Sequence, residues 1–211
     1  MKKTFFLIFA IFIAFMVQGQ TKKAEKILDD LSMKIKSYES FFIDFTFEIN
    51  NPDSEVNESD KGKLLVQGDN YRLSVAGQVV ICDGETIWTY IEEAEEVQIN
   101  SLEDDDGMIS PSNILTFYDK NYKSKFLKEE EIDGKIIQII ELKPIEDRNF
   151  SKVDFFIDKE KLQVVKVNIF DKNDGTITYT VDNFLSNIPT KASDFTFNEE
   201  DYPGVEVIDM R

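Results

Sequence analysis

The sequence contains no histidine and a single cysteine, Cys82, among its 211 residues. Histidine is the usual general base at neutral pH, the base of serine triads and the commonest zinc ligand. Its absence therefore removes a part from most hydrolase and metalloenzyme mechanisms. The sequence also lacks a nucleophile motif such as Gly-x-Ser-x-Gly. We expect a protein that is not an enzyme.

The lone cysteine and the acidic runs indicate that neither a disulfide nor a bound metal ion stabilises the fold. One cysteine cannot form a disulfide within the chain, so a packed core must supply the stability. We interpret Cys82 as a buried structural thiol. The acidic runs at 104–107 and 171–175 lack the alternating oxygen ligands and distal glutamate of a calcium loop, and we interpret them as turns. No metal site is expected.

Basic residues are scarce relative to acidic ones, 24 against 41, which gives a net charge of −17. A charge of this sign disfavours nucleic acid and anionic lipid surfaces as partners. The acidic residues either keep the protein in solution or steer it toward a basic partner surface, and the sequence leaves both open.

Residues 1–19 have the features of a secretory signal peptide. Two lysines precede an apolar run at 5–17, and the small Gly19 stands before Gln20. The run is short for a bilayer span, and no second long apolar stretch follows it. We predict cleavage near Gly19 and Gln20, leaving a single domain at 20–211. No cysteine stands at the cleavage point to carry a lipid.

Two helices are expected. Apolar residues at three- and four-residue spacing predict an amphipathic helix over 21–40. In the middle of the chain, Ser110 can cap a helix with Pro111 in its first turn, followed by several apolar residues to 118. This second helix would separate two halves of a sheet.

From Phe41 onward the apolar period changes to two, which predicts strands. The clearest strand is 41–50. Short β-branched and aromatic runs between turn residues predict ten more, at 60–67, 70–75, 78–82, 85–91, 95–100, 122–131, 135–143, 151–158, 162–170 and 176–186. Short turns join neighbouring strands, so the sheet should be antiparallel, and so long a meander should curl toward a barrel.

Taken in order, these segments resemble the LolA family of periplasmic lipoprotein carriers over essentially the whole of 20–211. The most specific piece is the Asp83-Gly84 hairpin that runs into Trp88 and Tyr90. The other resembling residues are Ser40-Phe41, Phe45, Gly62-Lys63-Leu64, Tyr71-Arg72, Pro111, Leu142-Lys143-Pro144, Phe195-Thr196-Phe197 and Pro203-Gly204-Val205. The resemblance implies a mainly β (α+β) fold, an incomplete antiparallel β-barrel of about eleven strands closed by a helical lid.

The same resemblance implies a periplasmic chaperone that holds the acyl chains of lipoproteins in a hydrophobic cavity and moves them from the inner to the outer membrane, without a cofactor. Its partners would be acylated lipoproteins, the inner-membrane ABC transporter that releases them, and an outer-membrane receptor. The protein would act as a monomer. The alternative is a general lipid-binding protein, or a sensor of mislocalised lipoproteins, with the same fold.

Seven side chains are candidates for the wall of the cavity, five on strands and two on the lid. They are Phe45, Phe47, Leu64, Trp88, Tyr90, Leu115 and Phe117. Alternation alone leaves open which side of each strand faces inward. In the family an arginine–proline pair after the second strand helps to latch the lid. This chain has Gly68-Asp69 there, with Arg72 a few residues later.

Overall fold

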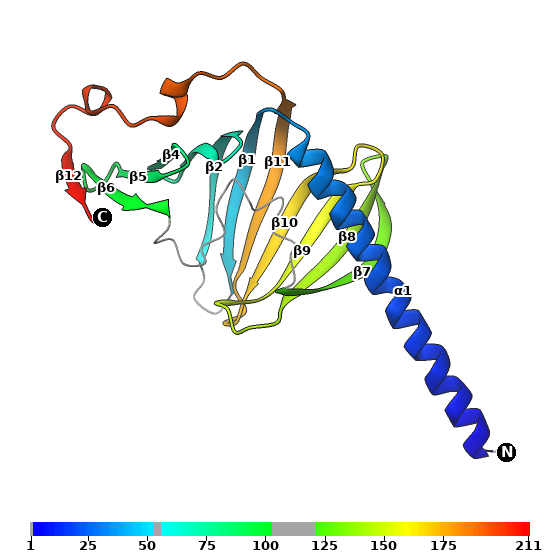
Figure 1. Ribbon diagram of the computed structural model, residues 1–211. Helices are drawn as coiled ribbons and strands as arrows, with labels where there is room; N and C mark the ends of the chain where they lie inside the picture. Colours follow the sequence, from blue (N-terminus) through cyan, green and yellow to red (C-terminus); the bar gives the residue numbers. More distant parts are fainter. Residues whose placement is uncertain (1, 53–55, 103–120) are drawn as a thin grey trace.

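The computed structural model describes residues 2–52, 56–102 and 121–211, with side chains from residue 19 onward. Its main element is one sheet of twelve strands in the order β12-β6-β5-β4-β3-β2-β1-β11-β10-β9-β8-β7 (Figure 1). The strands are β1 Phe41–Asn51, β2 Val56–Gln67, β3 Asn70–Val75, β4 Gln78–Cys82, β5 Thr86–Ile91, β6 Glu96–Ser101, β7 Tyr122–Ile132, β8 Lys135–Pro144, β9 Phe150–Asp158, β10 Gln163–Asp171, β11 Thr176–Ser186 and β12 Glu206–Asp209. The described helices are α1 (Lys2–Lys36) and the short 3-10 turns η2 (Ala192–Phe195) and η3 (Glu199–Asp201).

All eleven predicted strands are present, and most of their ends agree within a residue. The strand count is nevertheless a correction, because β12 makes a twelfth. β12 is four residues of the C-terminal segment that return along the edge of β6 and pair with it in parallel, Glu206 opposite Glu96. The other strand pairs are antiparallel, as predicted.

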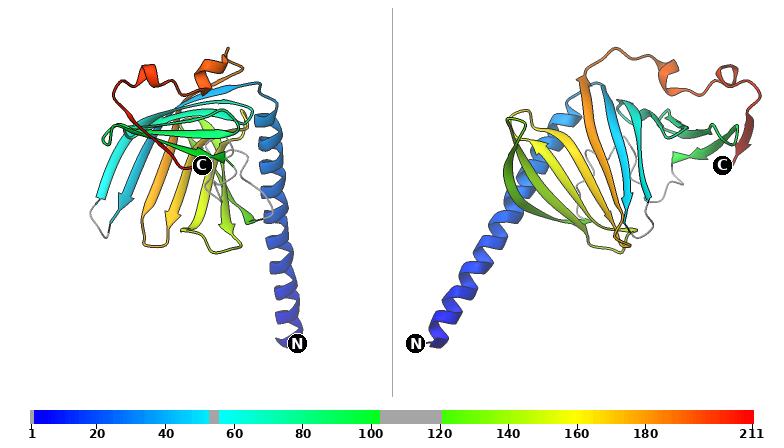
Figure 2. Two further views of the ribbon diagram at one scale, coloured as in Figure 1. Left: turned by 60° about the vertical axis from the view of Figure 1, so that its left-hand side comes forward. Right: turned by 180° about the vertical axis from the view of Figure 1, so that it is seen from behind.

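The sheet bends strongly but does not close (Figure 2). Within the described ranges, β7 and β12 are its two edges, and they pair with β8 and β6 rather than with each other. The predicted lid helix near 110–118, with Leu115 and Phe117, lies outside the described residues. What the structure provides is therefore an open, curved sheet with α1 beside it.

α1 continues through the predicted leader and ends at Lys36, four residues before the predicted end. The Ser37 amide donates to the carbonyl of Met33 at 3.1 Å, and the Ser37 hydroxyl donates to the carbonyl of Lys34 at 2.6 Å. These bonds satisfy carbonyls of the last turn, and the chain then turns into β1. In the described part of the chain, no helix has both the length and the apolar character needed to span a membrane.

One face of the sheet, called here the inner face, packs with α1 into the main core. Leu28, Leu31 and Ile35 of α1 are buried in this core. Strands from both halves of the sheet contribute to it, including Phe41, Ile43, Leu64, Val66, Tyr71, Cys82, Ile140, Leu142, Phe155 and Val167. Cys82 is fully buried, as its sequence context predicts.

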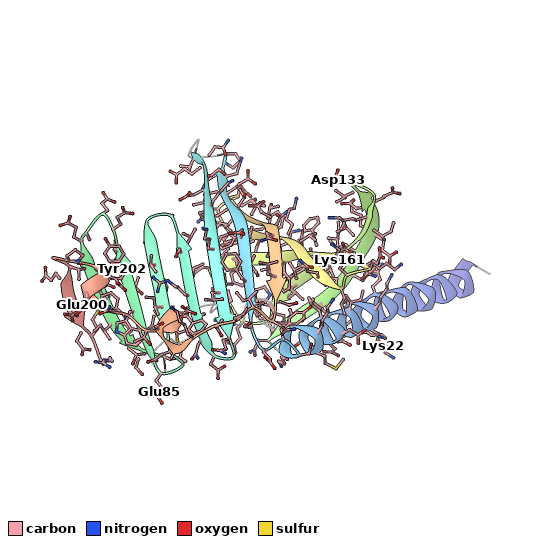
Figure 3. The ribbon with its side chains drawn as sticks, turned by 90° about the horizontal axis from the view of Figure 1, so that it is seen from above. Lys22, Glu85, Asp133, Lys161, Glu200 and Tyr202 are labelled. Atoms are coloured by element: carbon pink, nitrogen blue, oxygen red, sulfur yellow. The ribbon has the colours of Figure 1, made fainter. Side chains whose placement is uncertain are left out.

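The opposite face, called the outer face, carries a second and smaller apolar cluster. The C-terminal segment runs along the outer face of β3–β6, at the end of the molecule away from α1 (Figure 3). Phe195 in η2 is 1% exposed, and Ile81 and Val97 are buried outside the main core. Farther along the C-terminal segment, the Tyr202 ring packs against Tyr90, with 4.5 Å between the ring centres.

Candidate ligand-binding site

The inner face of β1 forms the middle of an apolar wall. Phe41, Ile43 and Phe45 alternate along β1 and are buried, and Phe47 is half-buried. Leu64 on β2 lies directly opposite Ile43. Cross-strand partners point to the same side of a sheet, so three of the seven predicted wall residues, Phe45, Phe47 and Leu64, share the inner face.

β11 extends this wall on the other side of β1. The ring of Tyr179 lies 5.8 Å from that of Phe45 and 5.2 Å from that of Phe47. Phe184 stacks on Phe41 at 5.8 Å. Burial raises the pKa of the Tyr179 hydroxyl above its usual value, because the phenolate would lose solvation among these rings. The wall is therefore apolar, with one neutral hydroxyl in it.

Sequence reasoning missed Tyr179 and Phe184. The alternation of Ile177, Tyr179 and Val181 was a usable signal, but the pairing of β1 with β11 shifts register between Asp44 and Phe45. After this irregularity Phe184, rather than an odd-numbered residue, faces inward opposite Ile43.

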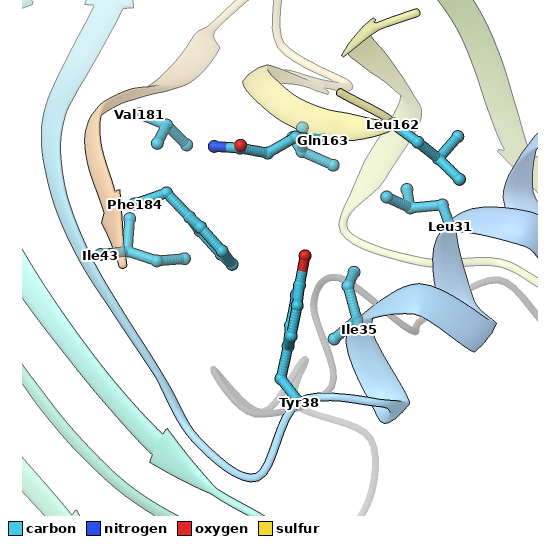
Figure 4. Close-up of a pocket in the computed structure, with 9 residues that line it drawn as sticks. Leu31, Ile35, Tyr38, Ile43, Leu162, Gln163, Val181 and Phe184 are labelled. Carbon is cyan, nitrogen blue, oxygen red and sulfur yellow. The ribbon is translucent and has the colours of Figure 1, made fainter. Parts of the chain in front are cut away.

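A small pocket lies where the end of α1 meets the wall (Figure 4). Tyr38 stands between Ile35 and Phe184, and the side chain of Gln163, at the start of β10, extends toward Val181. The lining is completed by Leu31, Ile43, Leu162, Val164 and Val181. Only about 10 Å³ is open to the centre of a water molecule, roughly room for one water. A larger ligand needs α1 or the side chains around it to move.

Other apolar side chains of the inner face are only partly buried. They include Phe47, Leu73, Val80, Phe126, Ile169 and Tyr179, which come from six different strands. A partly open apolar surface of this kind is what an apolar ligand covers when it binds. The inner face is therefore the candidate binding surface.

Trp88 and Tyr90 lie on the other side of the sheet. Ile87 belongs to the main core, so its neighbour Trp88 points to the outer face, opposite Ile81. Tyr90 packs on Tyr202 of the C-terminal segment, and Arg72 Nη2 donates to the Tyr202 hydroxyl at 3.1 Å. These two aromatics do not share a surface with Phe45 and Leu64, which corrects the expected grouping.

A polar cluster borders the inner face where α1 meets the edge strand β7. Glu129 accepts hydrogen bonds from Lys23 of α1 at 3.1 Å, from Gln138 at 3.0 Å and from Lys159 at 2.9 Å. These bonds, that from Gln138 first, lower the Glu129 pKa to about 2. The Nζ atom of Lys23 also lies 3.5 Å from the centre of the Phe126 ring.

The described side chains show no metal centre: within residues 19–52, 56–102 and 121–211, no three acidic or cysteine side chains are grouped so as to hold a metal ion. The candidate site consists of an apolar surface, a helix covering one end of it, and a charged contact at its border.

Comparisons with known proteins agree with this arrangement. A family model described as outer membrane lipoprotein carrier protein LolA matches residues 36–198. No curated protein matches the sequence. Among solved structures, an uncharacterized conserved protein from Thermus thermophilus is 10% identical over 89% of this chain and 99% of its own, with a TM-score of 0.62. This likeness shows a shared fold.

Two further solved structures are similar at lower scores. LprF from Mycobacterium bovis is 16% identical over 82% of this chain and 97% of its own, with a TM-score of 0.49. A putative outer membrane lipoprotein-sorting protein domain from Vibrio parahaemolyticus is 13% identical over 83% and 97%, with a TM-score of 0.47.

The family match extends from the end of α1 through η2 and takes in β1–β11, the strands that build the inner face. It covers well over half of the chain. The chain therefore belongs to the LolA family, whose members are periplasmic carrier and binding proteins rather than enzymes.

Proposed function

We propose that this protein is a periplasmic carrier that binds the acyl chains of lipoproteins against the inner face and moves them from the inner to the outer membrane. The observation that carries the proposal is the apolar inner face itself, with partly buried side chains on six strands. Residues 1–19 are the export signal, and residues 20–211 are the working domain. Membership of the LolA family supports the direction of transport.

The binding surface comprises Phe45, Phe47 and Leu64 of the expected residues, together with Tyr179 and Phe184. Each acyl methylene hidden from water contributes about 0.8 kcal/mol. A complete acyl chain buried in a rigid cavity would be released too slowly for a carrier. The narrow pocket beside α1 supports a surface that opens for the ligand and closes again, which keeps the affinity moderate.

The partners that follow from this role are an acylated lipoprotein as cargo, an inner-membrane ABC transporter as donor and an outer-membrane receptor as acceptor. The proposed working form is a monomer. The cargo is recognised through its acyl chains, because the inner face offers an apolar surface that spans several strands.

Native mass spectrometry of the protein with a co-expressed acylated lipoprotein tests this function. We expect a one-to-one complex that is lost when the cargo's acyl chains are removed. An empty protein, or one that holds only free lipid, would contradict the carrier function and favour a general lipid-binding or sensing role.

Two neighbouring residues of β4 provide a matched pair of variants. Val80 and Val79 are both half-buried, but Val80 lies on the inner face, opposite Leu73, and Val79 on the outer face, opposite Tyr90. We expect Val80→Glu to abolish the complex, because it places a charge on the apolar binding surface. Val79→Glu should retain the complex once both variants are shown to be folded.

A further inference from the structure

Two kinds of contact hold the part of α1 from residue 20 onward to the sheet. Toward its C-terminal end, Leu28, Leu31 and Ile35 are buried in the main core. Beyond the helix, the Tyr38 ring packs on Phe184 at 5.7 Å, and the buried Ser40 hydroxyl donates to the carbonyl of Ile188 at 2.6 Å. Buried apolar contacts of this kind do not weaken in salt, so this end of α1 is an anchor.

Nearer the N-terminal side, Ala24 buries a single methyl group in the same core, and the contact beside it is electrostatic. Lys23 binds Glu129 and lies over Phe126, and Lys159 binds the second oxygen of Glu129. The Lys23, Glu129 and Lys159 side chains are 46%, 29% and 51% exposed. Ion pairs between groups as exposed as these are weak and are screened by salt.

A local irregularity of β7 creates this contact. The pairing of β7 with β8 shifts register between Phe126 and Lys128, so that Phe126 and Glu129 both face inward. Without the shift, strict alternation would turn Glu129 outward and Lys128 inward. Bulges commonly redirect a side chain in this way, and here the redirected carboxylate meets α1.

β7 is an edge of the sheet, and α1 lies along it. α1 therefore covers the inner face on its β7 side. It is held there by the Ala24 methyl group and the Lys23–Glu129 contact, and it is anchored beyond by the apolar side chains from Leu28 to Tyr38. The contact that yields first is the exposed one. Once it breaks, mainly the methyl group of Ala24 still ties this part of α1 to the core, so α1 can move away from β7 while the anchor holds.

We propose that the gap between α1 and β7 is the entrance for the acyl chain, and that Glu129 is the residue that keeps it shut. This inference rests on the proposed function, since it names the route by which ligand reaches the same apolar surface. Glu129 acts by positioning α1 rather than by touching the ligand.

Glu129→Gln and Glu130→Gln make a matched pair for the test. Both residues lie on β7, but Glu130 faces outward and pairs with Lys128. Lys23→Gln removes the same contact from the helix side. The rates of binding and release of cis-parinaric acid are measured by stopped-flow fluorescence, and hydrogen exchange is followed over 20–36 and 122–132.

We expect Glu129→Gln and Lys23→Gln to speed both binding and release by roughly two- to fivefold, with the dissociation constant nearly unchanged. Added salt should speed the wild-type protein toward the same rates. In both variants, hydrogen exchange should rise in the part of α1 that precedes the anchor and in β7. Glu130→Gln should show the rates and the exchange of the wild-type protein.

Equal rates and equal exchange for Glu129→Gln and Glu130→Gln would overturn the proposal. Faster exchange in Glu129→Gln with unchanged binding rates would also overturn it, because the ligand would then enter elsewhere. A wild-type protein that binds no cis-parinaric acid would count against the proposed function, while the exchange comparison would still test the contact.

Discussion

The ring of Phe45 lies across Gly62, so close that a Cβ atom on residue 62 would come within 2.1 Å of the Phe45 Cζ atom. The two residues are direct cross-strand partners on the inner face of β1 and β2. Gly62 is thus required for space: it lets a large ring lie flat against the sheet. This pairing shapes the centre of the proposed binding surface.

Gly62→Ala should destabilise the protein by about 1–3 kcal/mol, because the added methyl group forces Phe45 off its position. The measurement is the free energy of unfolding in urea. Phe45→Leu in the Gly62→Ala background should recover part of the loss, since the smaller side chain leaves room. If the two changes simply add, the ring and the glycine are not in the contact described.

Trp88 should report poorly on ligand binding, because it lies on the outer face. A brominated fatty acid quenches tryptophan only at short range, so saturating ligand should leave Trp88 emission nearly unchanged. Phe47→Trp in a Trp88→Phe background places the reporter on the inner face and should be strongly quenched. Strong quenching of Trp88 itself would place the ligand on the outer face and contradict the proposed binding surface.

The charge on Glu129 should persist into acid. Its pKa in the folded protein is about 2, against 4.5 for an unperturbed glutamate. A lowered pKa means that its contribution to stability is complete above about pH 4.5 and is lost as the pH falls toward 2. A carboxyl titration by NMR should give a midpoint near 2, and Gln138→Ala should raise it. A midpoint near 4.5 in the wild-type protein would show that the contact with α1 is not formed.

Phe195 should hold the C-terminal segment on the outer face. Phe195→Ala removes a ring that is 1% exposed, and we expect a loss of about 3–5 kcal/mol in unfolding free energy. Hydrogen exchange should increase in 187–211 and along β6, whose edge β12 covers. The exposed Glu200 serves as control, and Glu200→Ala should change stability by no more than about 0.5 kcal/mol.

Alternation and turn residues were enough to predict β1–β11, because short hairpins depend on local chemistry. β12 was missed because it is only four residues long and pairs with β6, more than a hundred residues earlier in the chain. α1 ends earlier than its apolar spacing predicts, since the Ser37 hydroxyl caps the last turn. Local rules do not contain the pairing of β12 with β6, because it joins segments that are far apart in the chain.

The candidate site, too, was predicted only in part. Phe45, Phe47 and Leu64 were predicted for one wall and share the inner face. Trp88 and Tyr90 were grouped with them as two aromatic residues on one face of their strand. The sequence does not distinguish the face that packs in the main core from the face under the C-terminal segment. Leu115 and Phe117 stay predictions, since they lie outside the described residues.

The sequence alone determined the class of the protein: a mainly β domain without histidine chemistry, rich in aromatics and resembling one carrier family. Only the tertiary structure decided which face each strand presents. A side chain's face follows from pairing register. Register shifts such as those on β7 after Phe126 and on β11 opposite Asp44 and Phe45 reverse the alternation beyond them. Glu129 meets Lys23 across 106 residues of chain for that reason, and no local pattern in the sequence predicts such a meeting.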